Sequence, residues 1–208
     1  DIFMTETAHY ADVVLPASAF PEKTGTFTNT DRRVQLGRQA LDPPGEARQD
    51  LNIIMEMARR IGLDWNYRGP SDVFDEMRQA MPSIAGITWE RLEHDNAVTY
   101  PCEREGDPGD AVIFTERFPR TGGRALLVPA ALSNADELPD DEFPLVLITG
   151  RQLEHWHTGA MTRRASVLNA IEPEPVATFH EDQLAAAGVR PGDAVRLRSR
   201  RGSVSARA

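Results

Sequence analysis

The spacing of apolar residues predicts two helices in the first half of the chain. From Asp50 to Ile61, apolar side chains recur every three or four residues, and Gly62 provides the stop. The inward face of this helix is predicted to carry Leu51, Ile54, Met55, Ala58 and Ile61. For a second helix we predict Ser71 as the N-cap and Pro82 as the end. Its inward-facing residues are predicted to be Val73, Phe74, Met77 and Met81.

Short apolar runs predict strands elsewhere. Residues 11–15 (ADVVL) and 145–149 (LVLIT) have the length and composition of buried strands, and residues 112–115 and 125–128 are shorter candidates. Residues 21–33 (PEKTGTFTNTDRR) are rich in Gly, Thr and Asn, which predicts a loop that presents backbone N–H groups and hydroxyls.

The last part of the chain has a different pattern. A short helix is predicted at residues 181–187, ended by a glycine. Apolar and arginine side chains then alternate over residues 194–199, which predicts a strand that turns at Arg201-Gly202 toward residues 203–206. The inward side chains of this strand are predicted to be Val195 and Leu197.

Residues 136–142 (DELPDDE) are acidic and interrupted by proline, which predicts a linker. We therefore predict two domains, an α/β part over residues 1–141 and a mostly β part over residues 142–208. The chain starts without methionine and stops inside the predicted hairpin, so we expect it to be part of a longer polypeptide.

Composition excludes several classes of protein. The 208 residues carry 23 Lys and Arg against 32 Asp and Glu, and a net charge of −9 argues against a nucleic-acid or anionic-membrane surface. No apolar run approaches the roughly 18 residues needed for a transmembrane helix. The single cysteine, Cys102, excludes an internal disulfide framework and a cysteine-ligated zinc or iron–sulfur site in this chain. We interpret Cys102 as structural, because no His or Lys lies near it in sequence.

Two segments could carry chemistry. Residues 149–164 (TGRQLEHWHTGAMTRR) combine His, Thr and Arg after a predicted strand, which suits a phosphate-bearing or heterocyclic ligand. A polar loop that buttresses a barrel is the alternative, and a metal site at His155 and His157 would be incomplete, since two histidines alone do not make a full ligand set. In residues 21–33, small donors and Arg32-Arg33 suit an anion, although an ordinary turn with a solvated charge pair is equally consistent.

Three segments resemble a known family. The segment TGRQLEHWHTGAMTRR resembles the start of the C-terminal cofactor-binding barrel of formate dehydrogenases that contain two molybdopterin guanine dinucleotides (bis-MGD). ADVVLPASAFPEKTGTFTNTDRRVQ and AGVRPGDAVRLRSRRGSV resemble two further segments of the same family, in the same order. The HWHTG form is most similar to the alpha subunit of soluble NAD-linked formate dehydrogenases.

The resemblance implies a fold and a set of site residues. Residues 1–141 would be a portion of the Rossmann-like molybdopterin oxidoreductase α/β domain, with the linker, and residues 142–208 the N-terminal part of a double-psi β-barrel that binds molybdopterin dinucleotide. By motif position, the residues that line or support one pterin dinucleotide would be Gly150, Arg151, Gln152, Leu153, His155, His157, Thr158, Thr162 and Arg163. Further candidates near the cofactor are Glu22, Gly25, Thr26, Thr28 and Asn29.

The resemblance also implies a reaction, the oxidation of formate to carbon dioxide at molybdenum or tungsten. Electrons would pass through iron–sulfur clusters elsewhere in the full chain to partner subunits that carry iron–sulfur clusters, FMN and NAD, in the cytoplasm. The metal ligand and catalytic residues of the family lie outside this segment, so we expect no catalytic or metal-ligating residue here and an inactive isolated chain. Nitrate reductase, another molybdopterin oxidoreductase and a non-catalytic homologue in a respiratory complex remain the alternatives.

Overall fold

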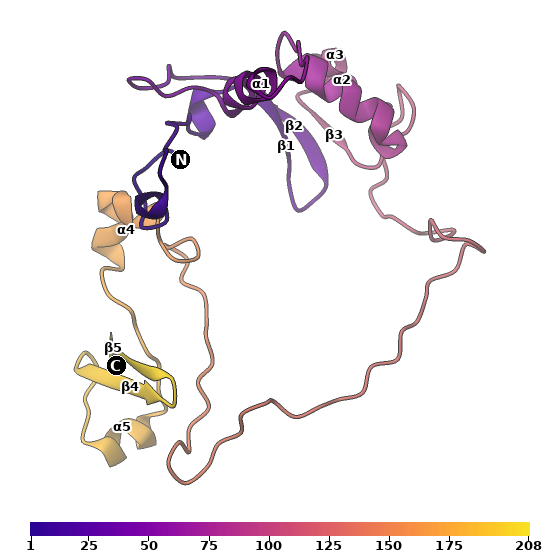
Figure 1. Cartoon of the computed structure of the whole chain (residues 1–208). Coiled ribbons are helices and arrows are strands. Elements are labelled where there is room, and N and C mark those ends of the chain that lie inside the picture. Colours follow the sequence, from indigo (N-terminus) through magenta and orange to yellow (C-terminus); the bar gives the residue numbers. More distant parts are fainter. The chain divides into compact units, whose positions relative to one another are not determined.

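The computed structural model describes all 208 residues and divides into two units, residues 1–128 and residues 129–208. Figure 1 shows their helices and strands. The first unit contains the 3₁₀ turns η1 (Ala8–Tyr10), η2 (Phe20–Glu22) and η3 (Pro82–Ile84), the strands β1 (Gly25–Thr28), β2 (Arg33–Gly37) and β3 (Ala97–Thr99), and the helices α1 (Asp50–Arg60), α2 (Pro70–Ala80) and α3 (Trp89–Asp95). The second contains η4 (Thr162–Arg164), α4 (Ser166–Ile171), α5 (Glu181–Ala187), β4 (Ala194–Ser199) and β5 (Gly202–Arg207). None of the helices combines the length and apolar character needed to span a bilayer.

The three strands of the first unit form an antiparallel sheet in the order β1-β2-β3. Phe27 pairs with Gln35 across the first ladder, and Val34 pairs with Val98 across the second. The prediction of a loop over residues 21–33 is therefore wrong. The β-branched and aromatic side chains of Gly25–Thr28 favour a strand, and the turn closes where the Asn29 N–H donates to the Arg33 carbonyl at 3.0 Å.

The core of the first unit lies between this sheet and the helices α2 and α3. Leu92 on α3 and Ile87 before it are fully buried, and Phe74 on α2 packs edge-on against Trp89. The other buried members of this cluster are Val34, Ile84, Val98 and Cys102. Because one face of β2 is covered in this way, the register of the sheet is fixed by burial.

The predicted helix after residue 50 is confirmed, and its predicted face is only partly right. The helix α1 ends at Arg60, and Gly62 adopts a left-handed φ of 86°. Met55 and Ala58 are buried, but Ile54 and Ile61 are exposed, while Ile53 is buried instead. No helix or strand packs extensively against α1, so no single partner element imposes one buried stripe on it.

The second predicted helix is also present, with a different start. The helix α2 begins with Pro70 in its first turn, and Ser71 is not the N-cap. Proline suits this position because the first helical N–H groups have no partner within the helix. Phe74 is buried as predicted, whereas Met77 and Met81 are exposed.

Four predicted strands do not form. Residues 11–15, 112–115, 125–128 and 145–149 lie outside every strand of the structure, and the apolar side chains from Leu145 to Ile148 are exposed. A buried strand requires a neighbour that accepts and donates its backbone hydrogen bonds, and the chain offers these runs none. Conversely, the helix α3 and the strand β3 were not predicted. They are seven and three residues long, respectively, which is too short for a clear periodic pattern of apolar residues.

The second unit is built on the hairpin β4–β5. The predicted strand and helix are confirmed with their bounds, and Gly188 ends α5 with a left-handed φ of 66°. The turn consists of Arg200 and Arg201, one residue before the predicted position, because Ser199 still pairs with Gly202. Among the apolar side chains of this unit only that of Ala206 is buried. The boundary predicted after residue 141 concerns the intact protein and stays a prediction.

Candidate functional site

The segment from Gly150 to Ala165 is irregular chain up to the 3₁₀ turn η4, and backbone hydrogen bonds fold it onto itself. The Gly159 N–H donates to the Trp156 carbonyl, and the Arg163 N–H donates to the Gly159 carbonyl, both at 2.9 Å. Gly159 has a φ of 73°, and a Cβ there would lie 2.9 Å from Cγ of Arg163. His157 adopts a left-handed φ of 49°, which is uncommon for a residue other than glycine. We call residues 150–165 the His-Trp-His loop.

His155 is the buried residue at the centre of the His-Trp-His loop, with 8% of its surface exposed. Its Nε2 lies 2.7 Å from the Glu172 carbonyl oxygen, and since a carbonyl can only accept, Nε2 carries the proton. In the neutral ring Nδ1 then accepts from the Thr162 hydroxyl at 3.2 Å. The same hydroxyl oxygen accepts the Trp156 backbone N–H at 3.1 Å. Both ring nitrogens of His155 are therefore occupied by protein groups.

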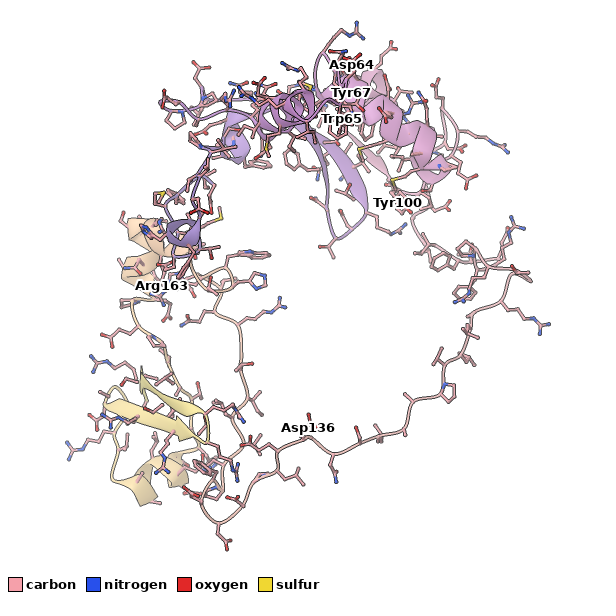
Figure 2. The ribbon with its side chains drawn as sticks, in the orientation of Figure 1. Asp64, Trp65, Tyr67, Tyr100, Asp136 and Arg163 are labelled. Carbon is pink, nitrogen blue, oxygen red and sulfur yellow. The ribbon has the colours of Figure 1, made fainter.

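Gln152 and Arg163 are also held by protein groups. Gln152 donates to the Glu172 carboxylate at 3.4 Å. Arg163, labelled in Figure 2, donates to the side chain of Asn169 on α4 at 3.2 Å and to the Pro173 carbonyl at 3.1 Å. These contacts tie the loop to α4 and to the chain that follows it.

Four other predicted site residues face solvent. The side chains of Arg151, His157 and Thr158 are exposed and have no hydrogen-bond partner in the chain, and that of Leu153 is 96% exposed. A Cβ at Gly150 would meet no atom within 4 Å, so the space beside its backbone is open. Four of the nine predicted residues, Gln152, His155, Thr162 and Arg163, form side-chain hydrogen bonds within the chain, and we call them the internal group. The others, whose side chains form no such bond, are called the exposed group.

Sequence reasoning missed Trp156 as a member of this surface. Its side chain is 68% exposed, and its ring contacts that of His157 edge-on at 4.8 Å. The signal that could have found it is a large aromatic residue between two histidines, since an exposed tryptophan is uncommon outside binding surfaces.

In the second predicted segment, residues 22–33, several groups are held by contacts within the chain. Gly25, Thr26 and Thr28 belong to β1, and the Glu22 carboxylate accepts the Ala19 N–H at 2.8 Å. The Arg32 guanidinium is also committed, because it donates to the carbonyls of Tyr100, Asp110 and Ala111 at 2.6 to 3.0 Å. A role of this segment near the cofactor stays a prediction.

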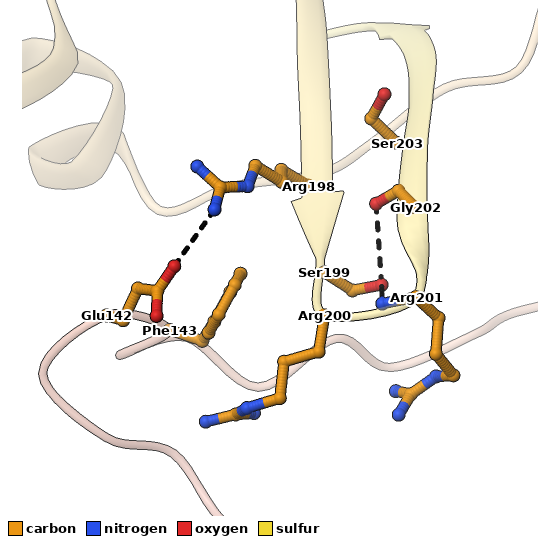
Figure 3. A pocket seen from close by; sticks show the side chains of 8 residues that line it. All are labelled: Glu142, Phe143, Arg198, Ser199, Arg200, Arg201, Gly202 and Ser203. Atoms are coloured by element: carbon orange, nitrogen blue, oxygen red, sulfur yellow. Dashed lines mark hydrogen bonds and ion pairs between the residues drawn. The ribbon is translucent and has the colours of Figure 1, made fainter.

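A third charged cluster joins the predicted linker to the tip of the β4–β5 hairpin. Arg198 pairs with Glu142 at 2.9 Å, Arg200 pairs with Glu137 and Asp140, and Arg201 pairs with Glu137. Figure 3 shows Phe143 and the three arginines gathered in this region, and the guanidinium carbons of Arg200 and Arg198 lie 4.7 and 5.4 Å from the Phe143 ring centroid. We call this cluster the linker–hairpin clasp. The sequence alone did not predict it, since the two partners lie about sixty residues apart.

Two carboxyl groups of the clasp have lowered pKa values. Hydrogen bonds from Arg201 and Arg200 lower the pKa of Glu137 from its ordinary 4.5. The Phe143 N–H, followed by the charge of Arg200, lowers the pKa of Asp140 from its ordinary 3.8. Both carboxylates are therefore ionised at neutral pH.

Two family models match separate parts of the chain. Residues 1–60 match the molybdopterin oxidoreductase family, and residues 145–208, which include the His-Trp-His loop, match the molybdopterin dinucleotide binding domain. Both ends of the chain are thus similar to parts of molybdopterin oxidoreductases.

Two relatives of the chain are similar over nearly its whole length. It is 43% identical to the F420-dependent formate dehydrogenase subunit alpha of Methanocaldococcus jannaschii, over 100% of this chain and 31% of that protein. It is 40% identical to the probable oxidoreductase YjgC of Bacillus subtilis, over 98% of this chain and 20% of that protein. The chain thus spans between about a fifth and a third of these relatives.

A solved structure supports the fold. The acetylene hydratase from Pelobacter acetylenicus superposes with a TM-score of 0.67 over 98% of this chain and 30% of that protein, with 22% sequence identity. At this identity the likeness concerns the fold alone.

Proposed function

We propose that the chain is part of the catalytic subunit of a formate dehydrogenase, in which it binds one pterin dinucleotide of a molybdenum or tungsten bis-MGD cofactor. The observation that carries the proposal is the His-Trp-His loop, where unpartnered Arg, His and Thr side chains face outward within a segment matched to a dinucleotide-binding domain. The names of the relatives favour formate as the substrate.

The donor set fits such a cofactor. Arg151 offers a planar fork of N–H donors for a phosphate, while His157 and Thr158 offer smaller donors for a pterin or a phosphate oxygen. Gly150 leaves room for a close approach of ligand to backbone. When bound, the cofactor supplies the two-electron oxidation of formate to carbon dioxide. The contribution of these residues is to bind and orient it.

The internal group supports the exposed group. His155, Thr162, Gln152 and Arg163 hold the loop through hydrogen bonds to Glu172, Asn169 and Pro173, so their part is to keep the donors in place. For a second contact region in the first unit we keep all five predicted residues as proposals, namely Glu22, Gly25, Thr26, Thr28 and Asn29. In the intact protein we propose that residues 1–141 belong to a Rossmann-like domain and residues 142–208 to a double-psi β-barrel.

We propose that a partner subunit reduces the final electron acceptor. We propose iron–sulfur clusters elsewhere in the polypeptide and a partner that reduces NAD, as the resemblance of the HWHTG segment implies. The F420-dependent relatives favour F420 as the second candidate. Formate-dependent reduction of NAD and of F420 by the purified complex separates the two.

The test of the function is analysis of the full-length protein for molybdenum and tungsten, with guanine nucleotide measured after acid release. About two guanine nucleotides per metal, together with formate-dependent dye reduction, is the expected result. Nitrate-dependent oxidation of a reduced dye without formate activity would assign the protein to another molybdopterin oxidoreductase. Absence of metal and nucleotide in protein from a competent host would assign it to a non-catalytic homologue.

A further inference from the structure

The His-Trp-His loop turns one large aromatic side chain outward at the point where its internal hydrogen bonds converge. The Trp156 N–H donates to Thr162 and the Trp156 carbonyl accepts from Gly159, so the backbone of this residue is fixed on both sides. The side chain, in contrast, is 68% exposed and touches only the ring of His157 among the aromatic residues.

Trp156 combines an exposed aromatic ring with neighbouring polar side chains that have no partner. It is next to His157 and Thr158, which are exposed and form no side-chain hydrogen bond within the chain, whereas the exposed Leu147 lies between the apolar residues Val146 and Ile148. An aromatic face beside a few available polar groups is the usual composition of a site for a flat heterocycle.

We propose that Trp156 stacks on a fused-ring heterocycle of the dinucleotide cofactor, with His155 as the positioning residue that holds it outward. The inference rests on the proposed function and adds to it a contact that neither the motif nor the family comparison assigns. His155 acts through the Thr162 hydroxyl and does not touch the ligand, because both of its nitrogens are bound to protein groups.

The experiment compares Trp156→Ala, Trp156→Phe and Met161→Ala in the full-length enzyme. Met161 is the matched control, since it is an exposed apolar residue of the same loop. The readouts are guanine nucleotide and metal per folded polypeptide, and the rate at which guanine nucleotide is lost on dilution. Since stacking on an aromatic side chain contributes substantially to base binding, we expect about tenfold faster loss for Trp156→Ala. We expect Trp156→Phe to restore most of the retention and Met161→Ala to match the wild type.

Two results would overturn the stacking proposal and leave the function standing. One is wild-type cofactor content and retention in Trp156→Ala. The other is a lowered melting temperature with normal cofactor per folded protein, which would mean that Trp156 packs against protein. If wild-type enzyme itself contains neither metal nor guanine nucleotide, the proposed function fails instead.

The same variants also show whether Trp156 stacks on the pterin or on the guanine of the cofactor. In a host that makes the pterin without attaching the nucleotide, metal content measures binding of the pterin end alone. Equal metal content in Trp156→Ala and wild type in that host, with reduced retention of the dinucleotide, assigns the stack to guanine. Reduced metal content in both hosts assigns it to the pterin.

Discussion

His155 and His157 are two positions apart and have opposite environments. His155 is buried and bound through both ring nitrogens, whereas His157 is exposed and has no hydrogen-bond partner. A sequence motif treats the two residues alike, but hydrogen bonding determines which one has a nitrogen available for a ligand.

The Thr162 hydroxyl links His155 to the Trp156 backbone, and this link can be tested directly. Thr162→Val leaves Nδ1 of His155 and the Trp156 N–H without their partner, at a cost of about 1–3 kcal/mol. We expect faster hydrogen exchange in the peptide that contains Trp156, measured by mass spectrometry on the full-length protein. Thr162→Ser keeps the hydroxyl and should exchange at nearly the wild-type rate. Equal protection in Thr162→Val and wild type would show that the link does not stabilise the loop.

Arg151 is the residue for which the phosphate contact is most directly testable. Its guanidinium is exposed and without a partner, so Arg151→Ala removes no internal contact. Loss of a charge-assisted hydrogen bond would weaken cofactor binding by about 1.5–3 kcal/mol, which we expect to appear as lower metal and guanine nucleotide content. Arg196→Ala, which removes another exposed and unpaired arginine on β4, is the control. Unchanged content in Arg151→Ala would contradict the contact.

At the scale of elements, the first unit owes its stability to a small core. Leu92 on α3 is fully buried against β2 and β3, while Met77 on α2 is exposed. We expect Leu92→Ala to lower the free energy of unfolding by about 2–5 kcal/mol, because it leaves a cavity. For Met77→Ala the expected loss is below about 1 kcal/mol. Urea unfolding followed by circular dichroism measures both, and similar losses in the two variants would contradict this core.

The linker–hairpin clasp is held by exposed ion pairs and so depends on salt and pH. The lowered pKa values of Glu137 and Asp140 mean that their stabilisation is present above the ordinary values and is lost as the pH falls through the lowered ones. We therefore expect faster hydrogen exchange of residues 137–143, after correction for the intrinsic rate, at about 1 M salt and again as the pH is lowered step by step below the ordinary pKa values of the two carboxyls. Residues 112–118 form no ion pairs and serve as the control. If the hydrogen-exchange rate of residues 137–143 changes with neither salt nor pH, the clasp does not hold the linker.

At the scale of the whole molecule, many large apolar side chains are exposed to solvent. In the second unit only Ala206 is buried among apolar side chains, and Leu145, Val146, Leu147 and Ile148 are exposed as a continuous run. Contiguous exposed apolar surface of this kind is typical of surfaces that another part of a protein covers.

This exposure predicts the behaviour of the isolated 208-residue chain. We expect it to bind the dye ANS and to self-associate, as measured by fluorescence and sedimentation. Leu147→Lys places a charge in the exposed run and should reduce self-association, whereas Leu184→Lys on α5, which lies outside that run, should not. A monomer that does not bind ANS would show that the chain covers these residues by itself.

Local sequence determined the elements whose stabilising interactions are local. The helix α5 with Gly188, the alternating strand β4 and the extent of α1 were all predictable, because caps, periodicity and turn residues act within a few positions. The candidate ligand loop was also predictable, since its residue types are those that bind phosphates and heterocycles.

Tertiary structure decided what depends on distant partners. Residues 11–15 and 145–149 have strand-like composition but do not become strands, because a strand forms only where another chain segment completes its hydrogen bonds. The commitment of Arg32 to three carbonyls and of His155 to Glu172 likewise depends on residues far along the chain or beyond the motif. The sequence therefore indicates which residues can bind a ligand, while the folded chain determines which of them are left unpaired to do so.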